Sequence, residues 1–317
     1  MLKFPRLWFL AGLILAAPEG FTQNTTQAAV SGDRALELAK SGHCNDAIPL
    51  LKKAIAQSTD KSFRRNAGLA GVRCAMVKNG FDAADEFLRQ LTRQFPNDPE
   101  VLYTAVHTYS DLATRASQQL ATRAPQSTKA HELNAESLEM QGKWDQAEKE
   151  YHQILQMDPQ LPGIHFKIGR LLLSEANPPA DAAEKAKKEF QQELQIDASN
   201  AGAEYVLGEL ARQAQQWDEA VRHFIRAAKL DSGFGDAFLG WGSALISTKK
   251  FSEAVAPLEA AVKLEPQNPA AHYNLATAYA RTGRKEDGER EFAVHRHLIQ
   301  NNQPAESQQP QAQSTPQ

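Results

Sequence analysis

The stretch AGAEYVLGELARQAQQWDEAVRHFIRAAKLDSGF at residues 201–234 decides the fold. Two stretches repeat its pattern at an interval of 34 residues: GDAFLGWGSALISTKKFSEAVAPLEAAVKLEPQN at 235–268 and PAAHYNLATAYARTGRKEDGEREF at 269–292. Each contains a large-small pair, such as Leu207-Gly208, followed by a small residue and then by a large residue four positions later. Because Ala, Leu, Glu, Gln and Lys dominate and long β-branched runs are absent, we expect two helices in each interval.

This pattern resembles the tetratricopeptide repeat (TPR), a helix-turn-helix unit of 34 residues. Small residues at the eighth and twentieth positions of a unit let its two helices approach closely. They are Gly169, Gly208, Gly242 and Ala276 at the eighth position, and Ala147, Ala186, Ala220 and Ala254 at the twentieth. The resemblance implies an all-α, right-handed superhelical solenoid of about eight helix pairs, each burying its apolar faces against its neighbours.

Departures from the period suggest how the chain is organised. We expect a signal peptide and linker at 1–27, degenerate repeats at 28–127, a regular array at 128–300 and a disordered Gln/Pro-rich tail at 301–317. The third unit, at 99–127, is about five residues short, and we expect it to contain two helices, the second near 114–123. The fifth unit is five residues too long. Pro178-Pro179 places its excess in a loop at 177–181, with Asp181 capping the next helix.

The N-terminal residues have the pattern of a secretory signal. Lys3 and Arg6 precede an unbroken apolar run of 11 residues from Leu7 to Ala17, which is short for a membrane span of roughly 20 residues. We therefore expect a periplasmic or secreted protein with no membrane span after signal cleavage. The alternative is anchoring to the inner membrane through residues 7–17.

Cys44 and Cys74 are the only two cysteines. In the inferred register they fall at the same end of two antiparallel helices, so in an exported protein we expect a disulfide between them. Two buried free thiols are the alternative. A metal site with His43 is a further one, although it lacks a third and a fourth ligand.

Charge and motifs argue against several classes of function. The net charge of −3, from 35 Lys and Arg against 38 Asp and Glu, gives no basis for nucleic-acid binding. Because no nucleophile motif, Gly-rich phosphate loop or zinc-protease helix occurs, we expect no enzyme, no cofactor and no metal. His131, His165 and His272 all fall at the fourth position of their repeats, which indicates a packing role.

The resemblance also implies where a partner binds, because the first helix of each repeat lines the inner groove in this family. Aromatic residues there would anchor a partner and arginines would pair with its carboxylates. The expected groove residues are Lys129, Glu132, Glu136, Phe166, Arg170, Tyr205, Glu209, Arg212, Tyr273 and Arg281. A solvated groove without a dedicated ligand is the alternative.

These observations predict a non-catalytic protein–protein interaction scaffold in the cell envelope. It would bind a peptide or partner segment in the concave groove. The alternative is a structural accessory subunit of an envelope assembly, secretion or polysaccharide-export complex.

Overall fold

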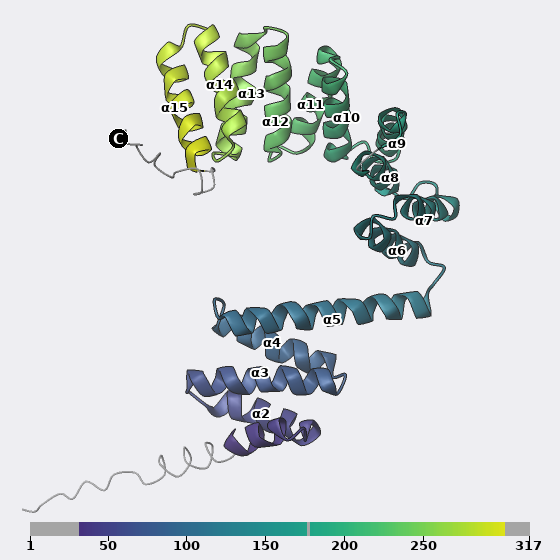
Figure 1. Ribbon diagram of the computed structural model, residues 1–317, viewed down its shortest axis with the longest axis vertical. Coiled ribbons are helices and arrows are strands. Elements are labelled where there is room, and N and C mark those ends of the chain that lie inside the picture. The colour runs from purple at the N-terminus through teal and green to yellow at the C-terminus, as the bar shows by residue number, and fades with distance from the viewer. Residues whose placement is uncertain (1–31, 176–177, 302–317) are drawn as a thin grey trace, which may run out of the picture. The chain divides into compact units, whose positions relative to one another are not determined.

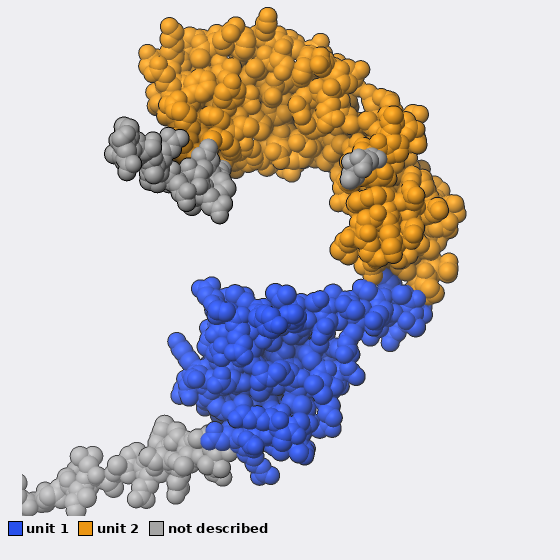
Figure 2. Space-filling model, viewed as in Figure 1, with its two compact units in different colours: residues 1–123 blue, residues 124–317 orange. Residues whose placement is uncertain are grey.

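The computed structural model describes residues 32–175 and 178–301, and regular secondary structure within these ranges is helical. The chain divides into two compact units, Met1–Arg123 and Ala124–Gln317 (Figures 1 and 2). The expected signal segment lies outside the described residues. So does the expected tail, apart from Asn301, which ends the last helix.

Unit 1 begins with helical residues 32–40, followed by α2 (Cys44–Gln57), α3 (Lys61–Val77), α4 (Phe81–Gln94) and α5 (Pro99–Arg123). Successive helices pack against each other, and α3 also lies beside α5. Leu51, Leu69, Phe87, Leu88 and Val101 are among the side chains that form one continuous apolar core. The two degenerate helix pairs therefore share a core despite their weak resemblance to the repeat.

Helix α5 corrects one prediction. The expected helix pair at 99–127 was wrong, because Pro99–Arg123 forms a single helix of 25 residues. No glycine or proline lies between residues 100 and 123, so the sequence contains no signal that would end a helix. The described chain therefore contains a lone helix where the 34-residue period predicts the third pair.

Unit 2 is a series of helix pairs. Its helices are α6 (Thr128–Met140), α7 (Trp144–Met157), α8 (Ile164–Ser174), α9 (Ala182–Ile196), α10 (Ala201–Gln213), α11 (Trp217–Leu230), α12 (Gly235–Ser247), α13 (Phe251–Leu264), α14 (Pro269–Arg281) and α15 (Lys285–Asn301). Each even-numbered helix, the first of its pair, packs on the odd-numbered second helix that follows. The first helices α10, α12 and α14 also lie side by side.

Close approach between paired helices depends on the small residues of the repeat. A Cβ atom on Gly208 would lie 2.8 Å from the ring of Phe224, and one on Gly242 would lie 2.3 Å from Cγ of Leu258. Real Cβ atoms essentially never come that close to a neighbour. The packing role predicted for the eighth position is therefore confirmed.

The long connection between α8 and α9 is only partly described, since residues 176 and 177 lie outside the described ranges. Asp181 occupies the N-cap position of α9, but its side chain makes no capping hydrogen bond. It lies 2.9 Å from Nζ of Lys185 instead. The predicted side-chain cap was therefore wrong, because the ion pair one turn into the helix engages the carboxylate.

Candidate functional site

Helices α6 and α8 face each other through predicted groove residues that are already paired. Nζ of Lys167 lies 2.8 Å from Oε1 of Glu132 and also contacts Glu136. Lys129 approaches Glu132 to 2.7 Å from within α6. Burial disfavours the ionised form of Glu132, but the hydrogen bonds from Lys129 and Lys167 outweigh it and lower its pKa. This ladder of charges stabilises the contact between the two first helices.

Two of the three arginines that were expected to bind a partner's carboxylates, Arg170 and Arg212, also have acceptors within the chain. Nη2 of Arg170 lies 2.9 Å from Oε2 of Glu139, and the hydroxyl of Tyr151 donates to the other oxygen of Glu139 at 2.5 Å. Arg212 donates two hydrogen bonds to Oε2 of Glu209 and one to Oε1. A partner's carboxylate would have to compete with these pairs.

Among the predicted aromatic anchors, Tyr273 presents the most surface. Phe166 and Tyr205 are partly buried; the ring of Phe166 lies 5.5 Å from that of Phe190. Burial, then the nearby charges of Glu209 and Asp236, raise the pKa of the Tyr205 hydroxyl to about 12. Tyr273 is 49% exposed, and its ring is supported by Phe292 and His295 of α15 at 5.8 and 5.3 Å.

Arg281, the last predicted groove residue, contacts an aromatic ring of the preceding helix pair. Its guanidinium carbon lies 4.6 Å from the ring centroid of Phe251, at the start of α13. A cation over an aromatic face is attracted by the ring quadrupole. This contact gives Arg281 a packing role between α13 and α14.

The structure supports the packing role predicted for the three histidines. Each histidine also contacts a glutamate carboxylate. His272 is buried, and Nδ1 of each of the three histidines lies 2.6 Å from a glutamate on the following helix. The sixth repeat has the same contact with the residue types exchanged. The four pairs are His131–Glu150, His165–Glu189, Glu204–His223 and His272–Glu291. Sequence reasoning missed them, although three share a spacing of 19 residues that signals a contact between paired helices.

Exposed large apolar side chains occur on first and second helices alike, but the most exposed ones lie on α5 and on the first helices, which in unit 1 include α3. Met140 on α6 is 85% exposed and Val77 on α3 is 73% exposed, whereas Met157, the most exposed large apolar side chain described on a second helix, is 45% exposed. On α5 the set comprises Leu102, Tyr103, Val106 and Tyr109. Met140 lies at the thirteenth position of its repeat, a groove position in the family, yet the predicted site omitted it.

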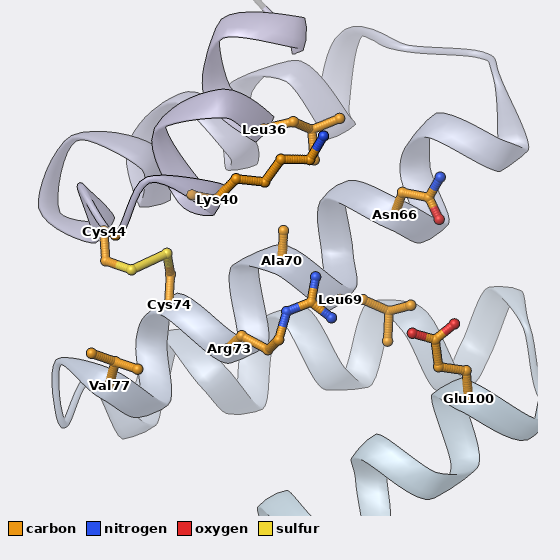
Figure 3. A pocket seen from close by; sticks show the side chains of 12 residues that line it. Leu36, Lys40, Cys44, Asn66, Leu69, Ala70, Arg73, Cys74, Val77 and Glu100 are labelled. Carbon is orange, nitrogen blue, oxygen red and sulfur yellow. A yellow bond between two sulfur atoms is a disulfide. The ribbon is translucent and has the colours of Figure 1, made fainter.

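Unit 1 contains a pocket of about 510 Å³ (Figure 3). Residues of the 32–40 segment, the turn that follows it, the start of α2, α3 and the first turn of α5 line it. They are Leu36, Ala39, Lys40, Gly42, Cys44, Asn66, Leu69, Ala70, Arg73, Cys74, Val77 and Glu100. The disulfide predicted between Cys44 and Cys74 is confirmed, with Cα atoms 5.0 Å apart, and it forms part of the wall.

The charges around this pocket are unequally compensated. Arg65 contacts Glu100 at 2.8 Å and Asp98 at 2.7 Å, so the negative charge at the rim has a partner. Lys40 and Arg73 make no ion pair with any residue that the structure describes. Above its apolar floor, the pocket therefore has two positive charges at the rim that no side chain in 32–175 or 178–301 neutralises.

Two further observations bear on the class of site. No group of three or more His, Cys, Asp or Glu side chains within 32–175 and 178–301 is arranged to hold a metal ion. In the same ranges, no helix has both the length and the apolar character that crossing a membrane demands.

Comparison with known proteins identifies repeats in unit 2. Residues 205–238 match the model of the tetratricopeptide repeat, and residues 242–283 match a second model described as a TPR repeat. No curated protein sequence matches the chain.

Several solved structures resemble part of the chain. A structure of MamA has 18% identity and a TM-score of 0.48, covering 58% of this chain and 97% of its own. A structure of YrrB, described as a TPR protein with an unusual peptide-binding site, has 18% identity and a TM-score of 0.49, covering 59% of this chain and 94% of its own. A structure of MamA from Desulfovibrio magneticus RS-1 has 15% identity and a TM-score of 0.48, covering 56% of this chain and 97% of its own. At these values the similarity says nothing about the partners of this chain.

Proposed function

Because this chain is a tetratricopeptide repeat protein, we propose that it is a non-catalytic scaffold that binds a segment of a partner protein on its first helices. The observation that carries the proposal is the distribution of exposed apolar side chains. The most exposed ones that the structure describes lie on α3, α5, α6 and α14, not on second helices. Exposed apolar surface with polar surroundings is typical of protein–protein contacts.

Met140 and Tyr273 are the strongest candidate anchors in unit 2. The ring of Tyr273 is held by Phe292 and His295, so binding would immobilise little additional side-chain freedom. Met140 is flexible and adapts to differently shaped partners. Lys129 and Arg170, which are 69% and 54% exposed despite their ion pairs, would supply polar contacts at the rim of the interface.

We further propose that the scaffold acts outside the cytosol, in the cell envelope or beyond it. The Cys44–Cys74 disulfide supports this, because disulfides persist in oxidising compartments and are rare in the cytosol. The apolar run at 7–17 supports export on sequence grounds. Alkylation of thiols in intact cells, followed by mass spectrometry with and without reductant, tests it. Two alkylated cysteines before reduction would contradict an oxidising location.

Quantitative affinity purification of the full chain tests the scaffold role. Met140→Lys and Tyr273→Lys place a charge on first helices, and Met157→Lys places the same charge on the second helix α7 as a matched control. We expect the first two variants to lose co-purifying proteins at least fivefold relative to the wild type and the control. Equal recovery with all variants would contradict binding on the first helices. A single partner at fixed stoichiometry would favour the accessory-subunit alternative.

A further inference from the structure

We infer that the pocket of unit 1 is a binding site for an acidic partner segment in which an aliphatic side chain is flanked by carboxylates. This inference rests on the proposed function, because it takes the ligand to be part of a protein. It adds a second site, in the degenerate repeats. The expected ligand of this site is acidic, whereas α6 and α8 present side chains of both charges to a partner.

The floor of the pocket fits an aliphatic side chain. Leu69 and Ala70 of α3 are buried, and Leu36 and Ala39 of the 32–40 segment contribute apolar surface from the opposite side. A volume of about 510 Å³ is within the range of about 300–1,000 Å³ that is usual for ligand sites. Val77, at the end of α3, extends the apolar surface into solvent. An apolar group bound here would be shielded from water on several sides.

The rim of the pocket fits a negatively charged neighbour of that side chain. Figure 3 shows the charged ends of Lys40 and Arg73 on either side of Ala70. Both side chains are exposed, and neither is paired with a described residue, so no described side chain competes with an incoming carboxylate for them. The one carboxylate that lines the pocket, Glu100, is held by Arg65 at 2.8 Å. Its repulsion of an acidic ligand is thereby reduced.

The described part of unit 1 as a whole has a positive net charge, like the rim of the pocket. Residues 32–123 contain 13 Lys and Arg against 10 Asp and Glu, whereas residues 124–301 contain 20 against 26. Unit 1 is thus the basic part of a chain whose net charge is −3. A positive surface attracts an acidic segment before contact and disfavours a basic one.

The pocket is also built to keep its shape. The Cys44–Cys74 disulfide joins α2 to α3 at one end. Hydrogen bonds from Arg65 to Asp98 join α3 to the start of α5 at the other. Because α2 and the start of α5 are both held to α3, a ligand would meet a preformed site, which lowers the ordering cost of binding.

Fluorescence anisotropy with the full chain tests the inference. The probe is a fluorescein-labelled peptide in which one leucine is flanked on each side by two glutamates. Its C-terminus is an amide, so the glutamate side chains carry all of its carboxylates. One comparison peptide has glutamines in place of the glutamates, and another has alanine in place of the leucine. Arg73→Ala and Lys40→Ala remove the rim charges one at a time, and Arg93→Ala, on the exposed side of α4, is the matched control.

We expect the wild type and Arg93→Ala to bind the acidic leucine peptide equally. Arg73→Ala and Lys40→Ala should each weaken binding by about five- to tenfold, which is typical of one charge-assisted contact. Both comparison peptides should bind at least fivefold more weakly than the probe. Because Lys40 and Arg73 are exposed, the variants should retain the circular dichroism spectrum and melting temperature of the wild type.

Three results would overturn the inference: no binding of the acidic peptide, equal binding of the glutamine peptide, or equal binding by Arg73→Ala. If Arg73→Ala instead lowered the solution mass of the free protein, the pocket would be occupied by a second copy and the inference would be wrong. None of these results would affect the recovery of partners by Met140→Lys and Tyr273→Lys. The proposed function can therefore fail or hold independently.

Discussion

Asp98 accepts two hydrogen bonds from the guanidinium of Arg65, at 2.7 and 2.9 Å, and so joins α3 to the start of α5. One of its oxygens also accepts the backbone N–H groups of Glu100 and Val101, each at 3.0 Å. These are N–H groups of the first turn of α5, which have no acceptor within the helix. This carboxylate therefore fixes the start of α5 against α3.

The first prediction concerns the acid stability of this contact. The hydrogen bonds from Arg65 and then from Val101 lower the pKa of Asp98 from 3.8 to about 2. Since the pKa is lower in the folded state than in the unfolded state, the contribution to stability is complete above about pH 4 and disappears as the pH falls toward 2. We expect Asp98→Asn to be less stable than the wild type at pH 6, and the difference to shrink below pH 4.

Urea unfolding followed by circular dichroism at several pH values measures this difference. Asp111→Asn, an exposed position on the same helix, is the matched control and should track the wild type throughout. A difference between the wild type and Asp98→Asn that stays constant from pH 6 to pH 2 would contradict the assigned role.

The second prediction concerns Glu193, a completely buried carboxylate on α9. It accepts the backbone N–H of Gly163 at 2.8 Å and that of Phe166 at 3.2 Å, at the start of α8, and the side-chain amide of Asn200 at 3.2 Å. Glu193→Ala would leave these donors without an acceptor, which should cost roughly 2–3 kcal/mol of unfolding free energy.

Chemical denaturation measures that cost. Glu193→Gln keeps one acceptor oxygen and should lose less, and Glu184→Ala, exposed on the same helix, should change the free energy of unfolding by under about 0.5 kcal/mol. If Glu193→Ala matched the Glu184→Ala control, Glu193 would not hold the start of α8.

The third prediction concerns Gly242, which faces Leu258 in the seventh repeat. Alanine has a higher helix propensity than glycine by about 1 kcal/mol, yet its Cβ would lie 2.3 Å from Cγ of Leu258. We expect the overlap to win and Gly242→Ala to destabilise the protein by about 1–2 kcal/mol. In a double-mutant cycle, Leu258→Ala should relieve part of this cost; strict additivity of the two substitutions would contradict the predicted contact.

The fourth prediction concerns the disulfide, which links residues 30 apart in the sequence. In the chain-entropy model, its removal should lower the free energy of unfolding by about 3–4 kcal/mol. Thermal unfolding of the wild type and of Cys44→Ala/Cys74→Ala, each with and without reductant, measures the effect. Reductant should destabilise the wild type and leave the double variant unchanged. A response of the double variant would place the sensitivity elsewhere.

The sequence was sufficient to predict the fold where local signals and the period agree. From residue 201 onward, the small residues and the 34-residue interval indicate the same boundaries, and the helices α10 to α14 follow them. At 99–123 the period predicts a turn, but no residue there ends a helix, and α5 continues through it. The local signal outweighs the period because α5 needs no turn to bury Val101, Ala105 and Thr108.

The candidate site was less accessible to sequence reasoning. Register placed Glu136 and Arg170 on first helices, but it could not show that Glu136 contacts Lys167 and that Arg170 contacts Glu139. Such pairs depend on the rotation and spacing of neighbouring helices rather than on position within one repeat. The pocket of unit 1 was missed for a related reason, since its walls come from degenerate repeats in which no groove positions had been assigned.

The central claim is that partners bind the exposed apolar side chains of the first helices. Site-specific photo-crosslinking in cells that express the chain tests it most directly, with a photoreactive amino acid in turn at Met140 and Tyr273 and, as controls, at Met157 and Leu264 on second helices. Discrete adducts of higher mass at Met140 and Tyr273, with none at the controls, are the predicted result. Adducts confined to Met157 and Leu264 would contradict the account.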